Sequence, residues 1–304
     1  MKVIEIFNRK LNQSLTYENK EMKAFRLQVD LLLKSVYERL FESDRAIIIG
    51  AGKMKDFSLT FFVKNFNHIV LTDIDLQTVN EEIKKFSFST KELDKITKIR
   101  MDYTGFEKNQ FFNDFKERIV NCHSFDKIDQ IINSKLDGLE NYKFLKSYQG
   151  SADFVYISPI YTQLVYNQVL RECAILRESG YPEHMIKYIE SILLDKMVEV
   201  INRFNDNIIE TLKPLGQIVA LSDIFQVDMG SSFYLRVKNG IKNYEVMEEI
   251  YEGYKAKYGV GLGDYGLLNL DEKLVPYLSR WLIWPYDNKS AFIVKLKIYK
   301  KKSI

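Results

Sequence analysis

The sequence has few cysteines and histidines, and it contains no long apolar run. Cys122 and Cys173 have no partner at metal-ligand spacing, and His68, His123 and His184 form no ligand pair or triad. We therefore expect a reducing compartment and assign no metal. No stretch approaches the roughly 18 apolar residues of a membrane span, and the amino terminus has no signal-like apolar core. We expect no membrane partner and a cytoplasmic location.

An excess of charge of one sign is also absent. The 304 residues include 44 basic and 41 acidic side chains, which gives a formal net charge of +3. One dense basic run lies near the end of the chain, where Lys295, Lys297 and Lys300 alternate with apolar residues. We interpret it as a last strand with a solvated lysine face, which disfavours a nucleic-acid partner. With 46% hydrophobic residues, the chain can bury a substantial core.

The most informative segment lies between residues 45 and 75. An apolar run ends in Gly50, Ala51 and Gly52, a helical pattern follows at 56–66, and a second apolar run is closed by Asp73 and followed by Ile74. Such runs suit strands that are buried on both faces, and glycines allow a tight turn beneath a ligand. This order predicts a Rossmann-like nucleotide-binding unit. Asp73, 21 residues after Gly52, is then placed to accept hydrogen bonds from both ribose hydroxyls.

A third glycine is missing from the turn. Dinucleotide-binding turns have this third glycine three residues beyond the second glycine, where this chain has Lys55. NAD is therefore disfavoured as the ligand. At this point the sequence resembles the class I S-adenosylmethionine-dependent methyltransferases. Their first motif is a strand with a shorter glycine turn, and their second is an acid that closes the next strand. Gly50, Gly52 and Asp73 match these places.

Two positions depart from that pattern. Ile48 stands where the superfamily usually has an acid, and Met54 stands where it often has a third glycine. Lys53 or Lys55 is placed to pair with the methionyl carboxylate of the cofactor, and Asp56 to accept from its ammonium. Asp56 is equally well placed to cap the helix that follows, and both interpretations stay open.

A third strand is predicted at 98–104, ending near Asp102 and Tyr103. The resemblance implies that Asp102 accepts a hydrogen bond from the adenine amino group, and we place Ala51, Ile74 and Tyr103 beside the cofactor with it. The alternative is that Asp102 begins a turn before Gly105, because aspartate is common in turns.

A fourth strand is predicted at 154–157, followed by Ser158, Pro159, Ile160 and Tyr161. This tetrapeptide resembles the Asn/Asp/Ser-Pro-Pro-aromatic motif of methyltransferases that act on planar amines, although Ile160 replaces the second proline. The resemblance implies that Ser158 and Tyr161 are the catalytic residues near the acceptor. Packing of the Tyr161 ring in the core is the alternative.

The resemblance implies an α/β fold, a doubly wound and mostly parallel sheet of seven strands with helices on both faces. We expect a helical cap at 1–44, followed by a Rossmann-like domain at 45–304 with insertions around 105–150 and 224–280. Pro182 starts a long helix that ends near 213–216, where a turn leads into a fifth strand at 217–221. Strands near 281–284 and 291–299 close the sheet, and the glycines between 259 and 266 are interpreted as a loop before them.

The function expected from this sequence is methyl transfer from S-adenosylmethionine to a small-molecule acceptor, with amines among the candidates. One alternative is a nucleic-acid or protein N-methyltransferase, which the tetrapeptide Ser158–Tyr161 favours. The other is a non-catalytic cofactor-binding or interaction module, which Ile48 and Met54 favour.

Overall fold

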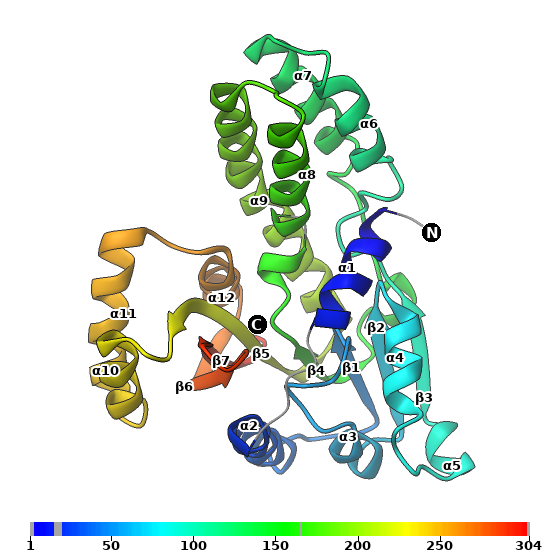
Figure 1. Ribbon diagram of the computed structural model, residues 1–304. Coiled ribbons are helices and arrows are strands. Elements are labelled where there is room, and N and C mark those ends of the chain that lie inside the picture. The colour runs from blue at the N-terminus through cyan, green and yellow to red at the C-terminus, as the bar shows by residue number, and fades with distance from the viewer. Residues whose placement is uncertain (1–2, 15–19, 165, 303–304) are drawn as a thin grey trace.

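A computed structural model describes residues 3–14, 20–164 and 166–302 of the chain. They form a seven-stranded sheet in the order β3-β2-β1-β4-β5-β7-β6, in which β7 runs antiparallel to both neighbours and the other paired strands are parallel (Figure 1). The strands are β1 (Arg45–Ile49), β2 (His68–Asp73), β3 (Ile96–Arg100), β4 (Ala152–Ile157), β5 (Leu212–Asp228), β6 (Val275–Pro285) and β7 (Ser290–Lys300). The predicted α/β architecture, with its antiparallel closing pair, is confirmed.

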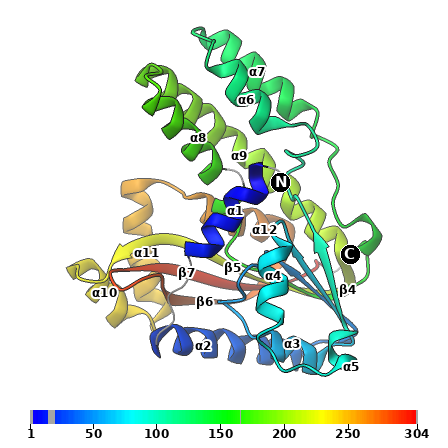
Figure 2. The same ribbon diagram turned by 45° about the vertical axis from the view of Figure 1, so that its right-hand side comes forward.

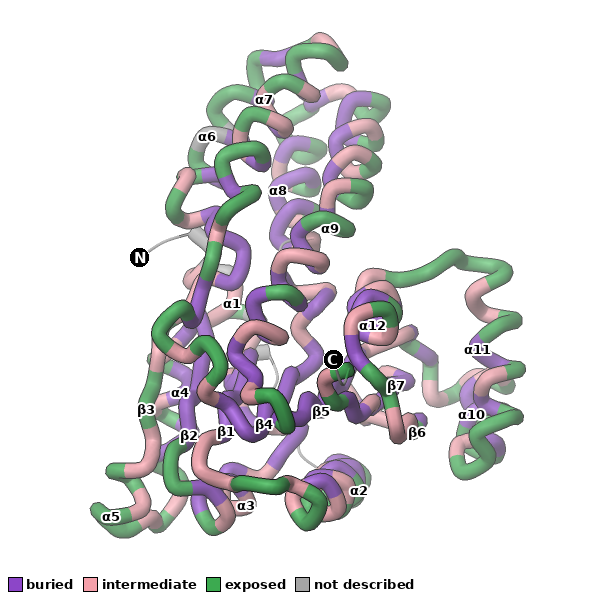
Figure 3. The backbone as a smooth tube through the Cα atoms, turned by 180° about the vertical axis from the view of Figure 1, so that it is seen from behind, coloured by how far each residue is buried: buried purple, intermediate pink, exposed green. Residues whose placement is uncertain are grey.

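The central strands form because their side chains are apolar on both faces. All residues of β4, and all of β1 after Arg45, are buried, as expected for strands with helices on both sides (Figure 3). Ile48 pairs with Tyr156 and Ile49 with Ile157, so β1 and β4 end at the same level. The chain order reverses between these two strands, and such a point leaves a crevice at the carboxyl ends of a parallel sheet.

Two helical layers cover the sheet. The first face is covered by α2 (Lys20–Tyr37), α3 (Leu59–Asn65) and α4 (Leu76–Ile83). On the other face lie α9 (Glu183–Thr211) and α12 (Leu262–Lys273). Beyond the sheet, α9 continues into a helical arm with α6 (Phe111–Ile119), α7 (Phe125–Asp137) and α8 (Tyr166–Glu178) (Figure 2). Short segments are α5 (Thr90–Leu93) and the 3-10 turns η1 (Lys146–Tyr148) and η2 (Tyr161–Gln163). Within the described residues, every helix is too short or too polar to cross a membrane.

The fifth strand is longer than predicted. It spans Leu212–Asp228, so the predicted turn around Pro214 is its first part. The register to β4 shifts between the pairs Ala152–Leu212 and Phe154–Gln217. This bulge accommodates Pro214, because a bulged residue needs no ladder hydrogen bond.

The far half of β5 and the β6–β7 pair carry a separate small core with α10 (Ser232–Gly240) and α11 (Tyr244–Tyr258). The predicted loop at 259–266 is wrong in its second half, because Gly263 and Gly266 lie in α12. A Cβ on Gly263 would stand 2.0 Å from the carbonyl oxygen of Asp223, and one on Gly266 would stand 2.5 Å from the ring of Tyr161. These glycines allow α12 to pack closely against β5 and η2.

Candidate functional site

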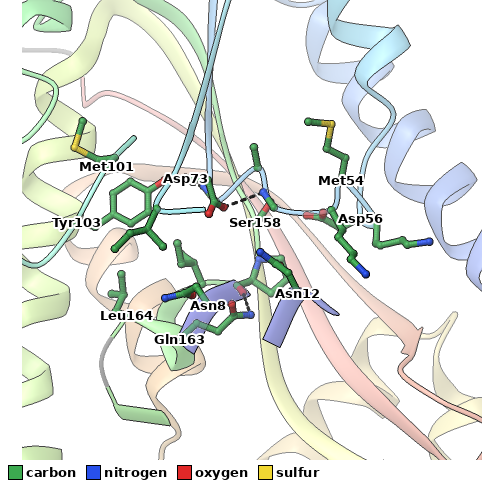
Figure 4. A pocket seen from close by; sticks show the side chains of 18 of the residues that line it. Asn8, Asn12, Met54, Asp56, Asp73, Met101, Tyr103, Ser158, Gln163 and Leu164 are labelled. Carbon is green, nitrogen blue, oxygen red and sulfur yellow. Dashed lines mark hydrogen bonds between the residues drawn. The ribbon is translucent and has the colours of Figure 1, made fainter. Parts of the chain in front are cut away.

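A pocket opens where β1, β2, β3 and β4 end (Figure 4). It brings together the predicted cofactor-binding residues and Ser158. Its lining comprises Asn8, Asn12, Gly50, Ala51, Gly52, Lys53, Met54, Lys55, Asp56, Asp73, Ile74, Met101, Asp102, Tyr103, Thr104, Ser158, Pro159, Ile160, Gln163, Leu164 and Trp284. Segments far apart in the sequence thus meet at the crevice that the strand order predicts.

The glycine turn after β1 is held by β2 and by the segment after β3. Gly50 and Gly52 have φ angles of 74° and 40°, in the left-handed region that favours glycine. The Gly50 amide donates to the hydroxyl of Tyr103 at 2.9 Å, and the Gly52 amide donates to Oδ2 of Asp73 at 2.8 Å. The turn is therefore fixed before any ligand arrives.

Asp73 is a buried acid with remaining capacity to accept hydrogen bonds. Its Oδ1 accepts from the Asp75 amide at 2.8 Å, and its Oδ2 accepts from Gly52. Each oxygen of an ionised carboxylate has a second acceptor position, so both can still take a hydroxyl. Burial raises the pKa of Asp73 to about 6 against these two hydrogen bonds, and the group remains ionised at neutral pH. The geometry suits a vicinal diol.

Tyr103 organises the turn as well as lining the pocket. Its hydroxyl lies 2.8 Å from Oγ1 of Thr72, which itself donates to the carbonyl of Ile48 at 2.8 Å. Because the Thr72 proton is used, the Tyr103 hydroxyl donates to Thr72 and accepts from Gly50. One tyrosine thus joins the ends of β1 and β2 to the segment after β3.

Asp102 lies on the pocket wall, but its carboxylate holds a turn. It accepts from the amide and hydroxyl of Thr104 at 2.9 and 2.7 Å, and from the amide of Glu107 at 2.8 Å. These contacts match the alternative in which Asp102 begins a turn.

Asp56 does not cap α3. The cap residue of that helix is Ser58, whose amide donates to Oδ1 of Asp30 at 3.1 Å. Asp56 is buried on the pocket wall, where its Oδ2 accepts from the hydroxyl of Tyr156 at 2.8 Å. Burial raises its pKa to about 6, opposed by the hydrogen bond from Tyr156.

Tyr161 is not among the residues that line the pocket. Its side chain is 1% exposed, its hydroxyl donates to Oδ1 of Asn205 at 2.9 Å, and its ring packs edge-on against Phe204. The backbone enters η2 at this point, so Ile160 reaches the pocket and Tyr161 faces α9 and α12. The structure thus separates Tyr161 from Ser158, in the arrangement of the core-packing alternative.

The sequence predicted helices at 1–44 but gave them no place in the pocket, which the first helix in fact crosses. On α1 (Val3–Ser14), Asn8 and Asn12 line it. Asn12 donates through Nδ2 to Oδ2 of Asp75 at 3.1 Å, and Glu5 pairs with Arg100 at 3.0 Å. Isolated asparagines in a polar helix form no motif, so the sequence carries no signal for this placement.

No protein-family model matches the sequence, and no curated protein matches it. The chain is similar to a solved SAM-dependent methyltransferase from Aquifex aeolicus, at 9% identity over 96% of this chain and 97% of that one, with a TM-score of 0.38. A SAM-dependent methyltransferase from Leishmania major is 10% identical over 90% and 72% of the two chains, with a TM-score of 0.40. One from Methanosarcina mazei is 11% identical over 88% and 96%, also at 0.40. At these identities the likenesses concern the fold alone.

Proposed function

We propose that this protein transfers a methyl group from S-adenosylmethionine to a small-molecule acceptor. One observation carries the proposal: the glycine turn after β1 and the Asp73 carboxylate line one pocket with Ser158. In this arrangement Asp73 takes the ribose hydroxyls, and the adenine lies beside Tyr103 and Met101. The remainder of the cofactor crosses the glycine turn toward Ser158.

The chemistry requires positioning more than acid or base strength. When bound, the cofactor would supply an electrophilic methyl group on a sulfonium. The acceptor's lone pair would form the new bond to the methyl carbon, and the electron pair of the broken carbon–sulfur bond would leave with sulfur. The protein holds the acceptor atom and the methyl carbon in a row, which can supply much of the rate. Ser158 stands where β4 ends, so its hydroxyl is placed to orient the acceptor. Tyr161 is left out of this site because it is buried elsewhere.

A small acceptor is favoured because the pocket is roofed. Asn8 and Asn12 of α1 lie across it, and Gln163 and Leu164 line it after β4. A pocket enclosed by a helix admits a metabolite more readily than a folded macromolecule, and enclosure also excludes water from the reacting groups.

A thermal-shift comparison tests the cofactor class. S-adenosylhomocysteine, S-adenosylmethionine, NAD and ATP are each added to the full-length protein. A ligand at 100 times its dissociation constant stabilises a protein by about 2.7 kcal/mol, so the two adenosyl thioether or sulfonium ligands should each raise the melting temperature by several degrees. A rise with NAD or ATP alone would contradict the proposal.

A further inference from the structure

The end of the pocket away from Asp102 carries charges of both signs. Lys53, Lys55 and Asp56 follow the glycine turn and line the pocket, as does Trp284 of β6. Trp284 is near them, because it stacks on Phe25, whose neighbour Arg26 donates to the carbonyl of Lys55. Figure 4 shows Asp56 on the opposite side from Tyr103, with Asp73 and Ser158 between them. A ligand whose ribose lies on Asp73 therefore presents its other end to this charged wall.

Asp56 is a buried and oriented hydrogen-bond acceptor, not a surface acid. It is 5% exposed, and the Tyr156 hydroxyl fixes one of its oxygens. Tyr156 pairs in register with Ile48, so their side chains lie on the same face of neighbouring strands. The Asp56 carboxylate is thus held over the strand end where Ile48 offers no charge. Keeping a carboxylate buried costs free energy, and a cationic ligand would offset that cost.

The indole N–H of Trp284 is a buried donor without a partner among the described residues. Its ring stacks on Phe25 with centroids 5.7 Å apart, which fixes its orientation. Its Nε1 is buried and has no hydrogen-bond partner among the described residues. Buried indole N–H groups normally find an acceptor, so one is missing at this wall of the pocket.

An acid, a lysine and an unpaired N–H donor on one wall match an α-amino acid. We propose that Asp56 accepts from the ammonium of an α-amino acid group, while Lys53 and the Trp284 indole donate to its carboxylate. The inference rests on the proposed function, in which this group is the methionyl end of the cofactor. Asp56, from the loop, thereby does the work that an acid at position 48 would do.

Calorimetry with two ligands tests the ammonium contact. S-adenosylhomocysteine carries the amino-acid end, and 5′-methylthioadenosine is the same nucleoside thioether without it. We expect Asp56→Asn to weaken S-adenosylhomocysteine binding about 10- to 100-fold, the range for a hydrogen bond to a charged group, and to change 5′-methylthioadenosine binding less than about twofold. Asp30→Asn is the matched control, because Asp30 holds the same loop at Ser58 but does not line the pocket.

The outcomes separate the two proposals. If wild-type protein binds neither thioether, the proposed function fails. If both bind and Asp56→Asn weakens both equally, or weakens neither, the amino-acid site is overturned. If Asp56→Asn weakens neither ligand, the cation for Asp56 would be an amine acceptor.

Lys53→Met tests the carboxylate half and replaces the first variant if Asp56→Asn does not fold. It should weaken S-adenosylhomocysteine about tenfold and leave its decarboxylated analogue, which keeps the ammonium, within about twofold. Equal losses for the two ligands would overturn the assignment of Lys53.

Discussion

Two regions of this molecule that bury charge differ in how that charge is compensated. In the small core of β6, β7 and α11, Lys295 lies 2.8 Å from Oε1 of Glu248 and 4.5 Å from the centroid of the Trp281 ring. The Trp281 indole donates to the same oxygen at 2.7 Å. Burial would raise the pKa of Glu248, but hydrogen bonds from Lys295 and Trp281 hold it below its usual value.

The pocket wall shows the opposite behaviour. Asp56 and Asp73 accept hydrogen bonds from hydroxyls and backbone amides, and the pKa of each is raised to about 6. Neutral donors do not compensate a buried carboxylate as a cation does. A buried acid paired with a cation thus holds structural elements together, whereas a buried acid with neutral donors alone is available to a cationic ligand. Substitutions in the first region should therefore lower stability, and substitutions in the second should lower ligand affinity.

Loss of the cation from the matched region should cause the largest effect. We expect Lys295→Met to lower the free energy of unfolding by about 3 to 5 kcal/mol, because Glu248 would lose its cation and keep the neutral donor Trp281. Chemical denaturation measures the loss, with Lys300→Met on the exposed end of β7 as the control. Cofactor affinity should be unchanged, and a stability loss below about 1 kcal/mol would contradict the structural role.

Loss of the pocket acid should act on the ligand instead. Asp73→Ala should weaken S-adenosylhomocysteine binding by about 2 to 4 kcal/mol, since two charge-assisted hydrogen bonds disappear. Calorimetry measures this loss. Asp75 is unsuitable as a control because it caps α4 through Thr78 and contacts Asn12. Asp223→Asn serves instead, as an acid within β5 that lies outside the pocket lining. Equal affinity losses for the two variants would remove the ribose assignment.

Asp223 is a third acid whose hydrogen-bond donor is neutral, and it makes stability depend on pH. Burial raises its pKa to about 6, against a hydrogen bond from Thr162, so the folded state holds a proton that the unfolded state has lost above pH 3.8. The contribution of Asp223 to stability therefore falls as pH rises from about 4 to 6. Asp223→Asn lacks this loss and should be more stable by about 1 to 3 kcal/mol at pH 8, with no difference below about pH 4. Melting curves across pH decide, and a constant difference would contradict the assignment.

The parts of the site that sequence reasoning located have local signals. The apolar run before Gly50 and the acid at Asp73 reflect chain geometry within one strand-turn-helix unit, which neighbouring residues largely determine. The same holds for α9, which begins after Pro182 as predicted. Placing both residues at one crevice required the strand order, which the resemblance implied.

The missed features depend on tertiary packing. Alternation in β7 identified its lysine face but not the helix that covers it, so Lys295 was expected in solvent and is 6% exposed. The glycines of α12 indicated a loop because a close approach to Tyr161 is invisible in one sequence. Asp56 was ambiguous for the same reason, since its choice between α3 and the pocket depends on Tyr156, 100 residues away.

The smallest expected effect concerns Tyr161, whose hydroxyl donates to Asn205 in the core. Tyr161→Phe removes one neutral hydrogen bond and should lower stability by about 1 kcal/mol, with cofactor affinity and turnover unchanged. Tyr103→Phe is the contrasting variant, because its hydroxyl holds the glycine turn at Gly50. It should weaken S-adenosylhomocysteine binding measurably in the same calorimeter. If Tyr161→Phe instead lowered turnover at an unchanged melting temperature, the tyrosine would belong to the acceptor site and not to the core.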